Sequence, residues 1–263
     1  AGLLLHRVMR NPISSPSVLG LVDGAAVGVV LFFWIFSNEA NALTVSVHWT
    51  PLAATSGAFF FAALVAVVSA RDIAQPARLI LYGIAMAALA KALVTVLIIL
   101  GPVYRASQAL IWLAGSVHAA HWDDVAILAT LLAAMVLPLI ALARPMDQLV
   151  LDDTSAGATG LWLGSVRLAA LGMTVILTAA AVSFAGGIAF VGLVAPHIAR
   201  ALVGFRMSAL LCVTPIVGAI IVLGADILAR IIAAPLELPT GAITALVGAP
   251  YFFWLLIKEV RRG

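Results

Sequence analysis

The sequence predicts an all-α membrane protein, a polytopic helix bundle with eight complete spans. Of its 263 residues, 64% are hydrophobic and only 10% are charged, and the mean hydropathy is +1.20. Soluble globular proteins carry about 25% charged residues, so too few charges remain here to cover a water-facing surface. The apolar stretches run unbroken for about 20 residues, which is the length of a bilayer-spanning helix and not the alternating pattern of an outer-membrane barrel.

The predicted spans form a single transmembrane domain, residues 1–263. The chain opens in an apolar stretch, Ala1–Leu5, that meets Arg7 and Arg10. We interpret residues 1–17 as the end of a truncated helix followed by a cytoplasmic turn. An amphipathic stretch, Ala106–Ser116, is too short to cross. The eight spans are Val18–Ser37, Leu52–Ala70, Ala77–Leu100, Val125–Ala143, Arg167–Ala185, Ile188–Val203, Ser208–Arg230 and Gly241–Ile257.

Lysine and arginine predict the orientation. With eight spans, successive connections between spans lie on opposite sides of the membrane. One side holds eleven lysine and arginine residues, and the other holds two. The excess marks the cytoplasmic side, so we expect an inner-membrane protein with a cytoplasmic C-terminus. The poorer side holds Arg105 and Arg230. The richer side holds Arg7, Arg10, Arg71, Arg78, Arg144, Arg167, Arg200, Arg206, Lys258, Arg261 and Arg262.

The sequence contains no catalytic or metal-binding constellation. A single cysteine, Cys212, excludes an internal disulfide framework and a cysteine-rich metal site. His48, His118 and His121 lack ligand-like spacing and an acidic cluster, so no metal site is expected. Walker-type phosphate loops are absent, so we expect neither a cofactor in this chain nor an enzyme activity of its own.

Two features within the spans are candidates for packing or transport. Gly20, Gly24 and Gly28 recur at every fourth residue, which favours close approach between membrane helices. Lys91 places an ammonium inside an apolar span. It either faces a water-accessible pathway or extends toward an interface as a packing lysine.

Acidic residues near the spans are few. Asp23 and Asp226 come closest, and both lie near span ends, which argues against proton-coupled transport. Asp226 and Arg230 are four residues apart and can pair on one helix face, either as a purely structural pair or as part of an outer docking surface.

The longest cytoplasmic connection covers residues 144–164. It carries Asp147, Asp152 and Asp153 among small residues. Helix-start chemistry at Asp152–Thr154 predicts a short helix pair parallel to the membrane, and a solvated connector is the alternative.

Several motifs follow one another along the chain. They are RNPISSPSVLG at 10–20 with GAA at 24–26, IWLAGS at 111–116, SFAGGIAFVGLVAPHIAR at 183–200, ADILAR at 225–230, ELPTG at 237–241 and GAP at 248–250. Together they resemble the signatures of the FecCD family of permeases, the membrane subunits of type II ABC importers for ferric siderophores, haem and cobalamin. The resemblance covers essentially the whole chain.

The resemblance implies a ten-helix fold, of which the eight complete spans are the third to the tenth. It also implies four kinds of partner: membrane lipid, a second permease subunit in a homo- or heterodimer, two cytoplasmic ATPase subunits that bind ATP and magnesium, and a periplasmic or lipoprotein substrate-binding protein. The expected cargo is an iron-siderophore-type chelate, with cobalamin or haem as alternatives. Rivals from other classes are an ion-coupled secondary transporter and a non-transporting assembly subunit.

The resemblance also assigns roles to individual residues. Residues 144–164 correspond to the family's ATPase-coupling loop, and Arg230, held by Asp226, corresponds to the arginine that meets the binding protein. The span of Lys91 resembles the pathway-lining fifth helix. This chain departs from the coupling-loop pattern at Asp152, Thr154, Gly157 and Thr159. The residues expected in the coupling loop are Asp147, Leu151, Asp152, Asp153, Ala156 and Gly160.

Overall fold

Helices make up nearly all of the computed structural model, which describes residues 1–38, 43–69, 76–101, 103–118, 120–151, 153–158, 160–233 and 238–260. Two 3-10 turns, η1 (Pro16–Leu19) and η2 (Val47–Trp49), precede α2 and α3. These ranges contain no β-strand, only one isolated β-bridge between Ser37 and Leu43. The predicted all-α class is therefore confirmed. The helices are α1 (Gly2–Val8), α2 (Leu21–Ile35), α3 (Thr50–Ser69), α4 (Pro76–Leu100), α5 (Val103–Ala114), α6 (Trp122–Gln148), α7 (Asp153–Ala158), α8 (Leu163–Ala185), α9 (Val191–Val203), α10 (Met207–Ala233) and α11 (Thr240–Val260).

Five segments in the described part of the chain are long and apolar enough to cross a membrane. They are Val47–Ser69, Ala77–Leu100, Trp122–Gln148, Leu163–Ala185 and Met207–Ile232. Each corresponds to a span predicted from the sequence. The remaining predicted spans correspond to α2, α9 and α11, and α5 is the predicted amphipathic helix.

Two helices are shorter than predicted. α2 has 15 residues and α9 has 13, or about 22 and 20 Å of rise, against a hydrocarbon core of about 30 Å. The residues that precede each of these two helices were predicted to be helical but are not in an α-helix. The turn η1 ends at Gly20, with φ 72°, and the backbone between α8 and α9 is irregular from Gly186 (φ 68°) to Phe190 (φ 65°).

α6 is longer than predicted at both ends. Asp124 accepts a hydrogen bond from the backbone N–H of His121 (3.1 Å), which caps the helix start at Trp122. At the other end the helix continues through Pro145 to Gln148. A proline removes its own N–H from the helix ladder and crowds the carbonyl four residues earlier. The fully buried Met146 packs this last turn into the core and offsets that cost.

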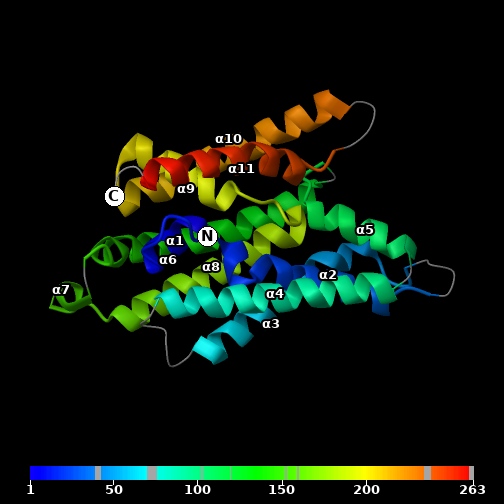
Figure 1. The fold of residues 1–263 in the computed structure, drawn as a ribbon, viewed down its shortest axis with the longest axis horizontal. Helices are drawn as coiled ribbons and strands as arrows, with labels where there is room; N and C mark the ends of the chain where they lie inside the picture. The colour runs from blue at the N-terminus through cyan, green and yellow to red at the C-terminus, as the bar shows by residue number, and fades with distance from the viewer. Residues whose placement is uncertain are drawn as a thin grey trace.

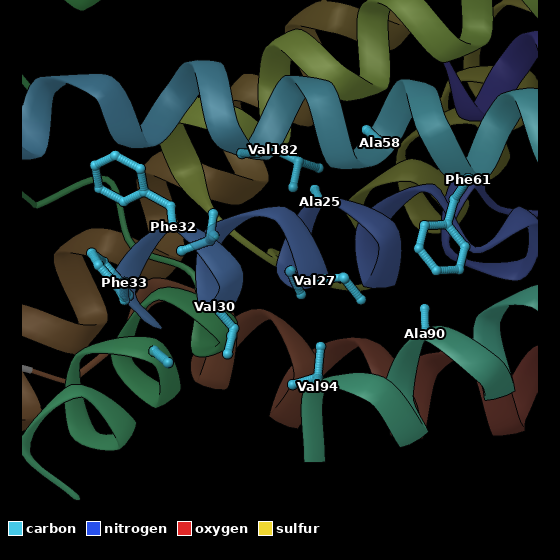
Figure 2. Packing of buried hydrophobic residues seen from close by; sticks show 14 of the residues in the cluster. Ala25, Val27, Val30, Phe32, Phe33, Ala58, Phe61, Ala90, Val94 and Val182 are labelled. Atoms are coloured by element: carbon cyan, nitrogen blue, oxygen red, sulfur yellow. The ribbon is translucent and has the colours of Figure 1, made fainter. Parts of the chain in front are cut away.

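α2 lies at the centre of the main apolar cluster, with α3 and α4 on either side of it (Figure 2). Ala25 and Val29 of α2 are completely buried, and Phe61 of α3 and Val94 of α4 pack into the same cluster. Lipid tails are as apolar as these side chains. Close van der Waals packing, rather than escape from water, therefore favours this arrangement in a bilayer.

The long helices run roughly alongside one another, so the bundle has two ends (Figure 1). α7 and the C-terminal end of α11 lie at one end, on the left of Figure 1, and we call this the α7 end. The C-terminal part of α5 and the N-terminal part of α11 lie toward the other, which we call the α5 end.

Candidate functional site

The 144–164 connection is more compact than the sequence predicts, because α6 extends to Gln148. In the described part it contains one short helix, α7, rather than a helix pair. Asp152 lies outside the described residues. Gly160 has φ 82°, a left-handed conformation that glycine adopts without strain, and it turns the chain toward α8.

Asp153, the first residue of α7, is held by two arginines from other segments. Its Oδ1 accepts hydrogen bonds from Arg10 Nη2 (2.7 Å) and from Arg167 Nη2 (2.8 Å). Arg167 lies in the first turn of α8 and its side chain is only 3% exposed, whereas that of Asp153 is 44% exposed. Partial burial raises the pKa of Asp153, but the hydrogen bonds and charges of Arg167 and Arg10 outweigh it, so the pKa lies below its ordinary value.

Arg10 makes further contacts with the same connection. Its Nε donates to the carbonyl oxygen of Leu149 (2.9 Å), and its Nη2 donates to that of Leu151. Arg10 follows α1 and has a left-handed backbone, with φ 47°. The Arg10 guanidinium thus binds both the backbone between α6 and α7 and the side chain of Asp153, the first residue of α7.

Asp147 makes a different set of contacts. Its Oδ1 accepts a hydrogen bond from the backbone N–H of Met207 (2.8 Å), the first residue of α10, and lies 3.6 Å from Arg7 Nη2. Arg7 also donates to the carbonyl oxygen of Phe205. A carboxylate is favoured at a helix N-terminus because the terminal N–H groups need acceptors. In this structure Asp147 stabilises the start of α10.

Apolar side chains of the 144–164 connection are exposed. Val150 is 60%, Leu151 45% and Trp162 81% exposed, while Ala156 is completely buried. A Cβ built at Gly157, Gly160 or Gly164 would meet nothing within 4 Å. α7 is therefore anchored by one face and presents its other side to solvent.

At the α5 end, Asp226 connects α10 to α11. Its Oδ2 accepts from Arg230 Nε (2.8 Å) and its Oδ1 from the Thr240 hydroxyl (3.1 Å), so the predicted i,i+4 pair is present. The Asp226 side chain is 11% exposed and that of Arg230 50%. The carboxylate is therefore buried, and the guanidinium reaches the surface.

Glycines pack tightly against backbone at the same end. Gly241 donates its N–H to the carbonyl of Gly115 (2.9 Å), and a Cβ on Gly241 would overlap the carbonyl oxygen of Ala114. A Cβ on Gly115 would lie 2.7 Å from the nitrogen of Ile188. These contacts join α5, α11 and the segment between α8 and α9 at a distance that only glycine permits.

The other residues singled out by the sequence lie along the bundle. Lys91 is on an exposed face of α4, close enough to Asp23 of α2 for a charge interaction. Gly24 and Gly28 face α3, where a Cβ on Gly24 would lie 2.7 Å from the Cβ of Phe61. Gly20 is the N-cap of α2 and faces α4 instead.

Within the described residues no group of three or more His, Cys, Asp or Glu side chains could hold a metal ion.

Sequence reasoning did not find the roles of Arg10 and Arg167. Arg10 appeared as a basic residue and as the first residue of the 10–20 motif, and Arg167 only as a basic residue. Their shared partner, Asp153, is 143 positions from Arg10 and 14 from Arg167. No helical or strand spacing connects residues so far apart.

Comparison with known proteins gives the family. A sequence model described as the FecCD transport family matches residues 1–258. The chain belongs to the FecCD transport family. It is 44% identical over 260 residues to the siderophore transport system permease protein YfhA of Bacillus subtilis, covering 98% of this chain and 75% of YfhA.

Two further likenesses support the family membership. The achromobactin transport system permease protein CbrC of Dickeya dadantii is 36% identical over 259 residues, covering 98% of this chain and 73% of CbrC. A metal-chelate type ABC transporter solved in an inward-facing conformation matches the fold with a TM-score of 0.87 and 29% identity, over 98% of this chain and 81% of that one. This FecCD chain therefore has the helix arrangement of an ABC transporter permease.

Proposed function

We propose that this FecCD chain is the membrane-spanning subunit of a binding-protein-dependent ABC importer that carries an iron-siderophore-type chelate inward. The observation that carries the proposal is the match over nearly the whole chain to a permease named for siderophore transport. Cobalamin or haem is the alternative cargo within the same family.

The proposed assembly has two permease subunits in the bacterial inner membrane, with the α7 end and the C-terminus in the cytoplasm. Two ATPase subunits hold ATP and magnesium and dock on the 144–164 connection. Exposed Leu151 and Trp162 and the open space around Gly157 and Gly160 support this docking surface. A substrate-binding protein docks at the α5 end, where Arg230 is exposed.

In the proposed transport cycle, this chain supplies the pathway and its partners supply the energy. A ligand or partner shifts a conformational equilibrium only by its differential affinity for the two states. The ATP-bound ATPases favour one position of the 144–164 connection, and this opens the pathway to one side. Lys91, exposed on α4, is the proposed cationic contact for an anionic chelate.

The test reconstitutes the full permease with its ATPases and binding protein in proteoliposomes that contain ATP. We expect uptake of a radiolabelled ferric siderophore that requires ATP and binding protein and that survives collapse of ion gradients by ionophores. Uptake driven by an ion gradient without ATP would replace the proposal with a secondary transporter. Selective uptake of labelled cobalamin or haem would change the cargo only.

A further inference from the structure

α7 is too short and too weakly connected to hold its own position. It has six residues, well below the length at which an isolated helix is stable. The chain reaches it through a turn at residues 149–151 and leaves it through Gly160, whose surroundings are open. Non-covalent contacts must therefore set where α7 lies. They include the packing of the buried Ala156 and the pairing of two arginines with Asp153.

Arg10, by contrast, belongs to a rigid turn. Asn11 Oδ1 accepts the backbone N–H of Ile13 (2.9 Å), and the hydroxyls of Ser15 and Ser17 are 2.6 Å apart. Pro12 and Pro16 restrict the backbone further. A turn built in this way transmits a displacement instead of absorbing it.

The same turn leads directly into the centre of the bundle. It ends at Gly20, where a Cβ would lie 2.9 Å from the backbone nitrogen of Ala87 in α4. α2 then packs through Gly24 and Gly28 against α3. Movement of the turn therefore moves α2 together with the parts of α3 and α4 that pack on it.

We propose that Arg10 is a positioning residue that couples α7 to α2. Its guanidinium binds the carboxylate of Asp153 and the carbonyl groups of Leu149 and Leu151, so α7 and the turn before α2 move together. Arg167 provides the parallel connection from Asp153 to α8. This inference rests on the proposed docking of an ATPase on the 144–164 connection, and it adds a second route by which that docking reaches the pathway.

The experiment compares Arg10→Ala, Arg10→Lys and the control Arg206→Ala in the full permease with its ATPases and binding protein. Arg206 is an exposed arginine that immediately precedes α10, outside the 144–164 connection, and it forms no ion pair with the described residues. Three quantities are measured: ATPase association, chelate taken up per ATP hydrolysed, and a spin-label distance between the turn and α7. The distance is measured in the permease without its ATPases, because one label lies on the proposed ATPase surface. The labels go on Ile13→Cys and Gly157→Cys in a Cys212→Ser background, because Cys212 is exposed.

With Arg10→Ala we expect ATPase association to stay within about twofold of wild type, while uptake per ATP falls about tenfold and the label distance broadens. The variant loses one partly exposed ion pair and two hydrogen bonds to carbonyl groups, and their combined loss shifts an equilibrium by roughly that factor. Arg10→Lys should recover part of the uptake, because an ammonium can still pair with Asp153 but lacks the planar fork that also reaches two carbonyls. Arg206→Ala should match wild type.

Unchanged uptake per ATP and an unchanged distance in Arg10→Ala would overturn the inference. So would a parallel loss of uptake, ATPase association and thermal stability that lysine does not relieve, because that pattern describes a purely structural arginine. Failure of the proposed function looks different: the wild-type permease itself would not bind an ATPase.

Discussion

The two ends of the bundle are held together by different means. At the α5 end, backbone packs on backbone through Gly115 and Gly241, with no room for a Cβ. At the α7 end, the glycines at 157, 160 and 164 face open space, and long arginine side chains make the connections. Backbone contact admits little displacement, whereas an arginine can follow a moving carboxylate. The α7 end is thus suited to movement and the α5 end to holding its shape.

The charged pairs at the two ends also differ in which partner, the acid or the arginine, is buried. At the α5 end the buried partner is the acid, Asp226, and the exposed partner is Arg230. At the α7 end the buried partner is Arg167 and the exposed partner is Asp153. Asp226 thus holds an exposed cation at the surface, while the double pairing of Asp153 satisfies its charge internally.

The largest effect should come from filling the glycine contacts. We expect Gly241→Leu to prevent assembly of the native bundle, because its Cβ would overlap the carbonyl oxygen of Ala114 and neither backbone can yield. Gly157→Leu is the matched control, and its side chain meets open space. Monodispersity and melting temperature in detergent would be measured for both. Equal stability of the two variants would refute the contrast between the ends.

A smaller loss is expected from Asp226→Ala. It removes the acceptor for the Thr240 hydroxyl and for Arg230, at a cost of about 2 kcal/mol of unfolding free energy. Arg230→Ala should cost less, about 0.5 kcal/mol, because that arginine is half exposed and Thr240 still donates to the carboxylate. Unfolding in denaturing detergent would rank the two variants, and the reverse order would contradict the buried role of Asp226.

Gly160→Ala isolates backbone strain from packing at the α7 end. A side chain there meets no neighbour, but a φ of 82° costs a non-glycine residue about 1 kcal/mol. We expect membrane insertion and melting temperature close to wild type for Gly160→Ala.

Gly160→Trp should also insert normally and yet abolish uptake, because its side chain would occupy the proposed ATPase surface. Normal transport by the tryptophan variant would remove Gly160 from that surface.

The pairing of Asp153 should make the α7 end sensitive to acid. Its pKa is lowered in the folded protein, so its contribution to stability is complete above its ordinary pKa of 3.8 and is lost as the pH falls through the lower folded value. Protection of α7 backbone amides from hydrogen exchange should therefore decline below about pH 4. Asp153→Asn should show weaker protection at neutral pH and no such decline. An identical profile in both proteins would count against the two-arginine arrangement.

The last prediction concerns binding: Arg230→Glu should lower the melting temperature at least as much as Arg230→Ala, because it places a second acid beside Asp226, but its diagnostic effect is on the binding protein. A charge at the rim of an interface acts mainly on the association rate and is screened by salt. We expect slower association of the binding protein at low salt, with the defect shrinking as salt rises. Surface plasmon resonance at two salt concentrations would measure it. Unchanged association with a lower melting temperature would make the arginine structural.

The sequence predicted the features that depend on local spacing. Long apolar runs identified the spans, and the four-residue separation of Asp226 and Arg230 identified their pair. The predicted span ended at Ala143, where the charged connection was expected to begin, whereas α6 continues to Gln148, because the burial of Met146 depends on distant helices. The Arg10 contacts with Asp153 and Leu149 likewise depend on how α1, α6 and α8 pack, and the motif that begins at Arg10 does not indicate them. Lys91 as a pathway residue stays a prediction.

The left-handed backbone of Arg10 has a consequence for protein engineering. Arginine at φ 47° carries a conformational cost of about 1–2 kcal/mol that glycine would not. Arg10→Gly relieves that cost and removes the side chain that couples α7 to α2. A selection for thermostable variants would therefore tolerate or enrich glycine at this position, whereas a selection for growth on the imported nutrient would retain arginine. Comparing the survivors of the two selections would separate what residue 10 does for folding from what it does for transport.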